Sequence, residues 1–143
     1  HLQLAHVYTQ VHQGKAKPDS QGVFEFIRLL NISQRLYNQI DLSKATEAEK
    51  NKLGLGAYSS KNNISRPDMI YLLSSKIMGY DIKDVFNLYG LATSSTAQSS
   101  IAMLNLPTAP LKFYAQPANR SNYLAEGTWI NVPANGVVAN YPY

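Results

Sequence analysis

Aromatic and hydrogen-bonding side chains are interleaved in the last part of the sequence, from Leu111 to Tyr143. The rings belong to Phe113, Tyr114, Tyr123, Trp129, Tyr141 and Tyr143, and the polar groups to Asn119, Arg120 and Asn122. Sugar rings present C–H faces that stack on aromatic rings, and their hydroxyls need amide or guanidinium partners. We therefore predict a surface that contacts a glycan or glycopeptide, with the candidate substrate-binding residues Asn119, Arg120, Tyr123 and Trp129. The alternative interpretation is that these rings cover an apolar helical core.

The three histidines, His1, His6 and His12, suggest a metal site. Because each residue of a helix advances by about 100°, these side chains point in three directions and cannot converge from one helix. A zinc-binding helix normally carries two histidines at i and i+4 with a glutamate between them, and this HExxH motif is absent. The sequence has no cysteine, which excludes thiolate ligands and cysteine nucleophiles. We interpret the histidines as surface residues and predict no metal ligand, cofactor or catalytic residue in this chain.

Three carboxylates lie where helices are expected to begin. Asp68 could orient a histidine or contact a substrate, but a carboxylate in the first turn of a helix is stabilised by the helix dipole without any further role. We favour this simpler interpretation. Asp81 and Asp84 are likewise interpreted as a cap and its first-turn companion.

The clearest structural signals occupy Ile64–Leu91, where the sequence predicts two consecutive helices. Ser65 can cap the first helix, Pro67 suits its first turn, and Gly79 can end it. The second helix is expected to start at Asp81 and to end at Gly90. Apolar spacing predicts that the first helix buries Met69, Ile70, Leu73 and Ile77, and that the second buries Ile82, Val85, Phe86 and Tyr89.

Two helices are expected near the N-terminus, over residues 1–13 and about 21–30, the second capped by Asp19 or Ser20. The second pattern predicts burial of Val23, Phe26, Ile27 and Leu30. After a possible break at Asn31 or Ser33, the apolar stripe continues through Leu36, Tyr37 and Ile40. Either Ser33 caps a short further helix or one helix runs through with a bend.

Three further features complete the helical part of the sequence. Thr46 and Glu49 have the spacing of a capping box, which predicts a short helix ending at Gly54, and a polar loop is expected over residues 58–63. The apolar positions Ala97, Ile101 and Leu104 indicate another helix, capped by Ser94, Ser95 or Thr96. It must end before Pro107 and Pro110.

The predicted fold is mainly α, a bundle-like domain of five to seven helices over residues 1–110. A short extended or β-rich tail over 111–143 packs on it, because this part carries turn pairs and β-type runs such as Thr128–Ile130 and Gly136–Val138. The length of 143 residues suits one domain. A net charge of +4 comes from scattered Lys and Arg, so nucleic-acid binding is not expected. No apolar run suits a membrane span, and no signal-peptide pattern is found.

Four stretches, in this order, resemble a known family: Gly22–Leu30, Pro67–Ser74, Gly79–Phe86 and Leu104–Pro107. They read GVFEFIRLL, PDMIYLLS, GYDIKDVF and LNLP. Over residues 1–110 the chain is similar to the region downstream of the zinc site in enhancin-like, mucin-degrading metallopeptidases of bacteria, of the accessory-colonisation-factor and ToxR-activated lipoprotein kind. That family carries its zinc ligands and general base in and just after an HExxH helix, so no catalytic residue is carried over to this chain.

The resemblance implies the C-terminal portion of a secreted or cell-surface virulence peptidase that acts on mucins and other glycoproteins. Zinc would be held by the parent chain, and this portion would wall one side of the active-site cleft. Its implied partners are the rest of the parent chain and a glycoprotein or glycan. Because the sequence begins at His1 rather than Met, we expect a piece cut from a longer protein. The competing hypothesis is a noncatalytic helical binding or adaptor module that recognises glycan or protein.

Overall fold

The structure is a computed structural model that describes residues 2–14, 17–115 and 127–133. Its elements are α1 (Leu2–Gln13), α2 (Ser20–Gln39), α3 (Glu47–Asn51), the 3-10 helix η1 (Lys61–Asn63), α4 (Arg66–Met78), α5 (Lys83–Leu88), α6 (Ser95–Ala102), β1 (Lys112–Ala115) and β2 (Thr128–Asn131). The described residues thus hold six α-helices and a two-stranded antiparallel sheet, which confirms the predicted mainly α fold with a short β-containing tail. The predicted strand at Gly136–Val138 lies outside the described residues.

Contacts divide the chain into two units. The first, which we call the terminal unit, combines His1–Ile27 with Pro110–Tyr143. The second, the helical unit, is Arg28–Ala109. The predicted division into a helical domain over 1–110 and a tail over 111–143 stays a prediction.

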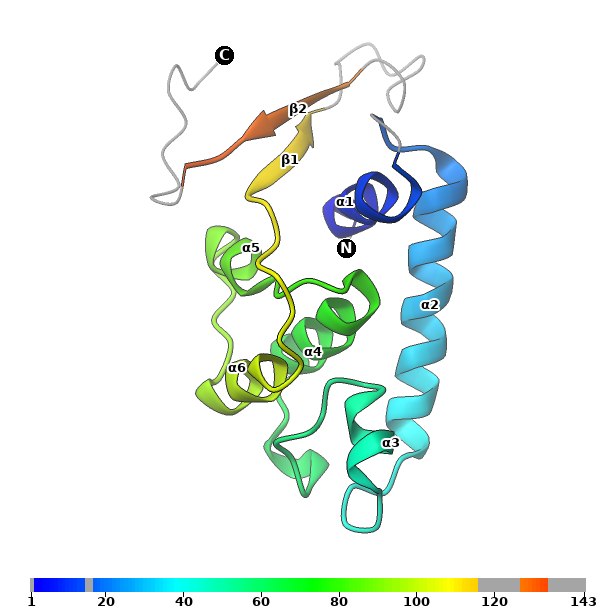
Figure 1. Ribbon diagram of the computed structural model, residues 1–143, viewed down its shortest axis with the longest axis vertical. Helices are drawn as coiled ribbons and strands as arrows, with labels where there is room; N and C mark the ends of the chain where they lie inside the picture. Colours follow the sequence, from blue (N-terminus) through cyan, green and yellow to red (C-terminus); the bar gives the residue numbers. More distant parts are fainter. Residues whose placement is uncertain (1, 15–16, 116–126, 134–143) are drawn as a thin grey trace. The chain divides into compact units, whose positions relative to one another are not determined.

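Helix α4 is enclosed on several sides in the helical unit, where it packs against α6 (Figure 1). Its buried residues are Asp68, Tyr71, Leu72, Leu73, Ser74, Ser75 and Met78. We expected one buried stripe formed by Met69, Ile70, Leu73 and Ile77. This prediction is wrong, because Leu73 alone of the four is buried and the others are half-buried. A helix enclosed on several sides buries residues around most of its circumference, so one stripe does not describe it.

Both ends of α4 follow the sequence signals. The Ser65 hydroxyl accepts a hydrogen bond from the Asp68 backbone N–H at 3.2 Å, and Pro67 occupies the first turn. Gly79 adopts the left-handed conformation, with φ 68°, and its N–H donates to the Ser75 carbonyl. The predicted start and end of this helix are therefore confirmed.

The start of α5 differs from its prediction. The N-cap position is Ile82, without a side-chain hydrogen bond, and Asp81 lies one residue earlier. The Asp81 carboxylate accepts the Lys83 N–H at 2.9 Å, so it stabilises the turn that leads into the helix. Tyr89, which we expected to be buried, is 52% exposed. The helix has only 6 residues, so the position seven residues after Ile82 falls beyond its end.

Asp81 connects three segments of the helical unit. Its carboxylate accepts a hydrogen bond from the Tyr71 hydroxyl of α4 at 2.8 Å. Burial, followed by this hydrogen bond and the carboxylate charge, raises the pKa of Tyr71, which therefore stays protonated as the donor. The Asp81 backbone N–H donates to the Pro107 carbonyl at 2.8 Å, and its carbonyl accepts the Ala109 N–H at 2.9 Å. The segment after α6 is thereby fixed beside the start of α5.

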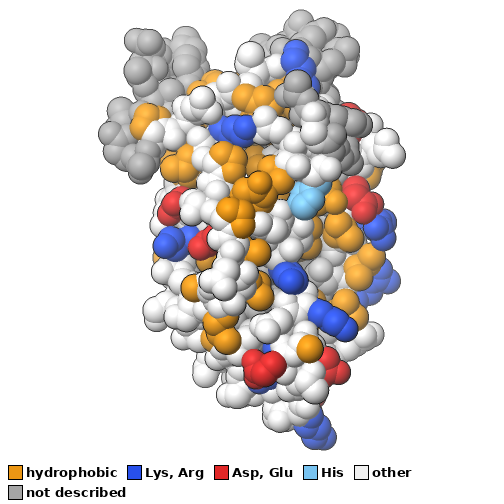
Figure 2. Space-filling view, viewed as in Figure 1, with side chains coloured by type: hydrophobic (Ala, Val, Ile, Leu, Met, Phe, Trp, Pro, Cys, Tyr) orange, Lys and Arg blue, Asp and Glu red, His pale blue; other side chains and the backbone are white. Residues whose placement is uncertain are grey.

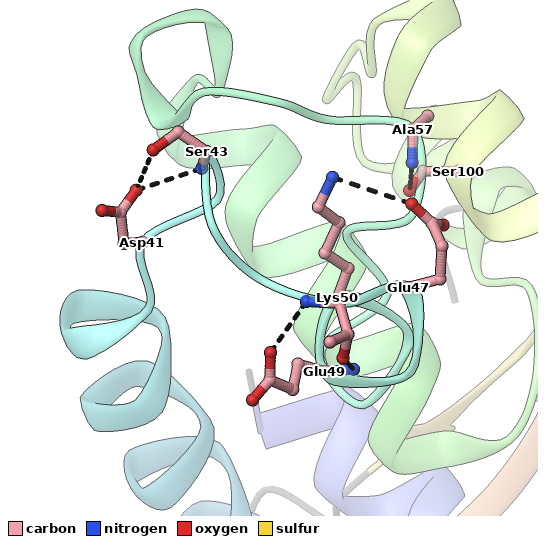
Figure 3. Close-up of polar contacts among 8 residues, drawn as sticks. Asp41, Ser43, Glu47, Glu49, Lys50, Ala57 and Ser100 are labelled. Carbon is pink, nitrogen blue, oxygen red and sulfur yellow. Dashed lines mark hydrogen bonds and ion pairs between the residues drawn. The ribbon is translucent and has the colours of Figure 1, made fainter.

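Helix α3 begins with the predicted capping box (Figure 3). The Thr46 hydroxyl accepts the Glu49 N–H at 3.2 Å, and the Glu49 carboxylate accepts the Thr46 N–H at 2.8 Å. The helix was predicted to end at Gly54, but it ends at Asn51; Gly54 lies in the turn that follows, in the left-handed conformation with φ 72°. The Ser100 hydroxyl of α6 donates to the Gly54 carbonyl at 2.7 Å and accepts the Ala57 N–H at 3.1 Å. A buried serine therefore ties this turn to α6.

The segment over residues 58–63 is not the polar loop that we expected. Tyr58 is only 4% exposed, and the last three residues form η1. The Lys61 ammonium donates to the carbonyls of Tyr37 and Asn38 at 3.1 and 3.0 Å. These carbonyls belong to the last turn of α2, where the helix itself supplies no donor.

Helix α2 runs without a break through Asn31 and Ser33, which decides between the two alternatives left open by the sequence. The Asp19 carboxylate accepts the Gly22 N–H at 2.8 Å, so Asp19 acts as the cap. The apolar stripe continues through Leu36 as expected from the helical spacing, but this side chain is 48% exposed.

In the terminal unit, β1 and β2 form an antiparallel ribbon that lies beside α1 (Figure 1). Its register pairs Lys112 with Asn131, Phe113 with Ile130, Tyr114 with Trp129, and Ala115 with Thr128. The Gln3 side chain of α1 extends this hydrogen bonding: its amide N–H donates to the Tyr114 carbonyl at 3.0 Å, and its amide oxygen accepts the Tyr114 N–H at 2.8 Å. A side-chain amide thus takes the place of a neighbouring strand at the edge of β1.

Gly54→Ala is expected to cost more stability than Gly90→Ala. Both glycines are left-handed, at φ 72° and 69°, so each substitution carries a backbone cost of about 1–2 kcal/mol. A Cβ at Gly54 would also lie 3.0 Å from the Leu72 carbonyl oxygen, whereas one at Gly90 meets nothing within 4 Å. We expect a further cost of about 1–3 kcal/mol at Gly54 from overpacking, measured by urea unfolding. An equal loss of unfolding free energy in the two variants would contradict the close packing of the Gly54 turn on α4.

Gln3→Glu is expected to lower the free energy of unfolding by about 1–3 kcal/mol at pH 7. A carboxylate accepts the Tyr114 N–H but cannot donate to the Tyr114 carbonyl, which then loses its partner on α1. The matched control is Gln21→Glu, an exposed position in the first turn of α2, where a negative charge is neutral or slightly stabilising. Equal stability of the two variants would show that the amide bridge is not needed.

Candidate functional site

One face of the β1–β2 ribbon brings an aromatic ring, an ammonium group and an amide together. Directly paired residues and residues two apart share a face of an antiparallel ribbon. Lys112 and Tyr114 of β1 therefore lie on the same face as Trp129 and Asn131 of β2, and we call these four residues the ribbon face. Tyr114 is buried, Lys112 and Trp129 are half-buried, and Asn131 is exposed.

The Tyr114 ring contacts one ring of α1 and one ring of the ribbon face. Tyr114 is 1% exposed, so this ring is buried. The His6 ring of α1 meets it edge-on at 5.5 Å between centroids, and the Trp129 ring is 5.1 Å away. Burial raises the pKa of Tyr114, against a smaller opposing effect of a hydrogen bond from the Gly127 backbone. A Cβ at Gly127 would lie 2.5 Å from the Tyr114 ring, so only glycine fits where β2 begins.

Lys112 covers the indole of Trp129. Its ammonium nitrogen lies 4.9 Å from the centroid of the Trp129 ring, within range for a cation–π interaction. Burial lowers the pKa of Lys112, since water hydrates the charged form less well in this position. Among the described residues, no carboxylate forms an ion pair with it. Because the Lys112 ammonium contacts a ring and not a carboxylate, it can donate hydrogen bonds to the acceptors of a ligand.

The structure places one of the four predicted substrate-binding residues. Trp129 is on the ribbon face, while Asn119, Arg120 and Tyr123 lie outside the described residues. Sequence reasoning missed Lys112 and Asn131. The available signal was the alternation of side chains along the strands KFYA and TWIN. Once the strands are paired, this alternation puts Lys112 and Asn131 on the same face as the rings of Tyr114 and Trp129.

The interpretation of the histidines as surface residues is wrong for His6, which is 0% exposed. His12 is exposed, and its ring lies 4.6 Å from that of Tyr8. His1 lies outside the described residues. The sequence could not distinguish these environments, because His6 is buried by residues far along the chain, Tyr114 among them.

Asp68 has a further structural role that we did not predict. Its side chain is 3% exposed, and its carboxylate accepts the Ser94 N–H at 2.8 Å. Ser94 is the cap of α6, since its hydroxyl accepts the Ala97 N–H at 3.2 Å. The carboxylate thus links the first turn of α4 to the start of α6. This link stabilises two helix starts and does not expose the carboxylate to a substrate.

No metal site is evident in the part of the chain that the structure describes, where no three His, Cys, Asp or Glu side chains are grouped to hold an ion. The described residues therefore do not fit a zinc ion. On the face shown in Figure 2, Lys and Arg side chains lie one by one among other groups. Within the described residues, no helix is long and apolar enough to span a membrane.

A groove lies in the helical unit, between the end of α2 and α3. It has a volume of about 280 Å³ and is lined by Leu36, Gln39, Ile40, Glu49, Lys52 and Leu53. We call it the α2–α3 groove. Its lining surface is mainly apolar, although Glu49 and Lys52 are among the lining residues, and the groove brings no catalytic pair together.

No protein-family model matches this sequence, and no curated protein sequence matches it. The fold is found in solved structures of the IMPa metallopeptidase. These include the enzyme from Pseudomonas aeruginosa, at 24% identity and a TM-score of 0.71, and the enzyme in complex with T-antigen, at 23% and 0.71. A structure of the Pseudomonas aeruginosa enzyme in complex with an O-glycopeptide is 23% identical, with a TM-score of 0.72.

The similarity covers 99% of this chain in all three comparisons. It covers only 15–16% of the IMPa chains, so this chain spans a small part of the length of the structures it matches. At such identities the likeness shows the fold: these 143 residues fold like one segment of a much longer metallopeptidase.

Proposed function

We propose that this chain is the C-terminal, non-metal-binding portion of a secreted zinc metallopeptidase that acts on glycoproteins such as mucins, and that it helps to shape the substrate cleft. One observation carries the proposal: almost the whole chain shares its fold with a segment of metallopeptidases solved with T-antigen and with an O-glycopeptide. The family resemblance of four sequence stretches supports the same reading independently.

The part played by this chain is to contact the substrate, through the ribbon face. The Trp129 indole offers an apolar surface to a sugar ring, and the exposed Asn131 amide beside it can donate and accept hydrogen bonds. Lys112 covers the indole in the free chain, so a sugar must displace its flexible side chain. The displaced ammonium then donates to sugar hydroxyls at the edge of the ring. Asn119, Arg120 and Tyr123 are proposed to extend this surface.

Zinc and the catalytic groups belong to the rest of the parent chain in this proposal. A zinc ion held by that part of the parent chain would supply the activated water for peptide hydrolysis. The described residues of this chain supply no ligand set for it, and they act by binding and orienting the glycopeptide. The proposed partners are the rest of the parent chain and a glycoprotein, at a secreted or cell-surface location.

The alternative is a noncatalytic helical module that recognises a protein or glycan. The α2–α3 groove favours it, because an apolar depression with the 48%-exposed Leu36 at its wall suits an apolar side chain of a partner. Sequencing the coding region upstream of His1 separates the two functions. An HExxH motif within the preceding hundred or so codons supports the peptidase, and a start codon close to His1 supports the module.

The isolated 143-residue chain is expected to show no hydrolytic activity on O-glycopeptides, because its sequence lacks the HExxH motif. Joined to the zinc-binding portion of the parent chain, it is expected to support cleavage that a chelator abolishes. Product formation can be followed by mass spectrometry. Chelator-sensitive cleavage by the isolated chain would refute the assignment.

Trp129→Ala is expected to weaken retention on an immobilised O-glycopeptide by about 30-fold, the loss for a residue worth about 2 kcal/mol. The substitution also removes ring contacts with Tyr114 and Lys112, so it will lower stability as well. Asn131→Ala separates the two effects, because this exposed side chain carries little of the packing. It should weaken retention about twofold to tenfold with an unchanged melting temperature.

The matched control for Asn131→Ala is Thr128→Ala, an exposed residue of the same strand on the opposite face of the ribbon. It should leave retention unchanged. The glycan proposal would be refuted if both Asn131→Ala and Trp129→Ala kept the retention of the wild type while Trp129→Ala was strongly destabilised. Trp129 would then serve only to pack the ribbon.

A further inference from the structure

His6 is buried without a hydrogen-bond partner for either ring nitrogen among the described residues. Buried polar groups are normally paired, as Thr9 is one helical turn away, where its hydroxyl donates to the Ala5 carbonyl at 2.9 Å. A neutral imidazole tolerates such a site better than a charged one, because burying an unpaired charge is far more costly. Histidine is also the side chain whose ordinary pKa lies closest to neutral pH.

The groups around His6 offer no compensation for a positive charge. Its ring contacts Tyr114, and the described residues of α1 include no Asp, Glu, Lys or Arg. The ionisable residues nearest along the elements packed against α1 are Lys112 and Tyr114 of β1, and Asp19, Glu25 and Arg28 around the first turns of α2. Helix α1 itself adds Tyr8 and His12. Burial is the one cause that lowers the pKa of His6 from its ordinary value of 6.5, with no contribution from these groups.

The ring that His6 touches is the one that holds the ribbon face. The Tyr114 ring contacts both the His6 ring and the Trp129 ring, and its backbone is bound to α1 through Gln3. A charge placed on His6 therefore acts where α1 and β1 meet. Two ring contacts, of 5.5 and 5.1 Å between centroids, lead from His6 through Tyr114 to Trp129, and the Lys112 ammonium lies 4.9 Å from the Trp129 ring.

We propose that His6 is a pH-sensitive latch: mild acidification charges its ring, separates α1 from the β1–β2 ribbon and disrupts the ribbon face around Trp129. The device does not depend on which ligand that face binds. If the face contacts glycans, the latch makes retention weaken in acid.

The direction of the pH effect follows from the linkage between protonation and folding. Burial lowers the pKa of His6 in the folded form, whereas the unfolded form takes up a proton near the ordinary value of 6.5. The stability that His6 contributes is therefore complete above pH 6.5 and is lost as pH falls below it. For a single proton, the equilibrium constant for opening rises by up to tenfold per pH unit, until the folded form also binds the proton.

Trp129 is the single tryptophan of the chain, so its fluorescence reports on the ribbon face alone. We would record urea unfolding by this signal from pH 7.5 to 5.0 in the 143-residue chain. The expected result is an unfolding constant that rises several-fold to tenfold per pH unit below 6.5. In His6→Phe, which keeps a ring against Tyr114 but cannot be charged, this rise should disappear. His12→Asn, at an exposed histidine of the same helix, should behave like the wild type.

Identical pH profiles of wild type and His6→Phe would overturn the proposal, as would a profile flattened by His12→Asn. If His6→Phe lacks helical circular dichroism at pH 7.5, His6→Leu takes its place. A second measurement needs no variant: the His6 ring proton resonance of the folded wild type should not shift as pH passes through 6.5. A folded-state titration with a midpoint at or above 6.5 would also overturn the proposal.

Discussion

The ribbon depends on the buried ring of Tyr114. A two-stranded ribbon alone is at best marginally stable in water, and this one becomes stable by packing one of its faces on a helix. Tyr114 supplies both parts of that attachment, since its buried ring contacts His6 and its backbone is hydrogen-bonded to Gln3. The requirement for glycine at position 127 follows from the same ring. The order of the candidate site therefore depends on the contact between α1 and β1.

The sequence predicts the beginnings and ends of helices well, because these depend on neighbouring residues. A serine, threonine or aspartate oxygen reaches an N–H two or three positions ahead, and a glycine takes the left-handed conformation without strain. Ser65, Thr46 and Gly79 behave in this way. What buries a side chain is decided by distant segments. The predictions for Met69 and Tyr89 were wrong for this reason, since local spacing contains no information on which elements surround a helix.

The same distinction applies to the candidate site. Trp129 was identified because its residue type is informative by itself, whereas Lys112 becomes relevant only through the pairing of two strands that are 12 residues apart along the chain. His6 was misread because nothing near it in the sequence indicates burial. The mainly α fold could be derived from the apolar periodicity. Which residues lie together at the candidate site could be seen only from the register of β1 against β2.

The link from Ser65 through Asp68 to Ser94 has a consequence for how the helical unit comes apart. Asp68 donates its N–H to the cap of α4 and accepts the N–H of the residue that caps α6, so one residue completes the first turns of two helices. Fraying at the start of α4 removes the acceptor on which the start of α6 relies, and fraying of α6 leaves a carboxylate buried without its partner. The two helix starts therefore open together, as one cooperative event, although 26 residues separate them in the chain.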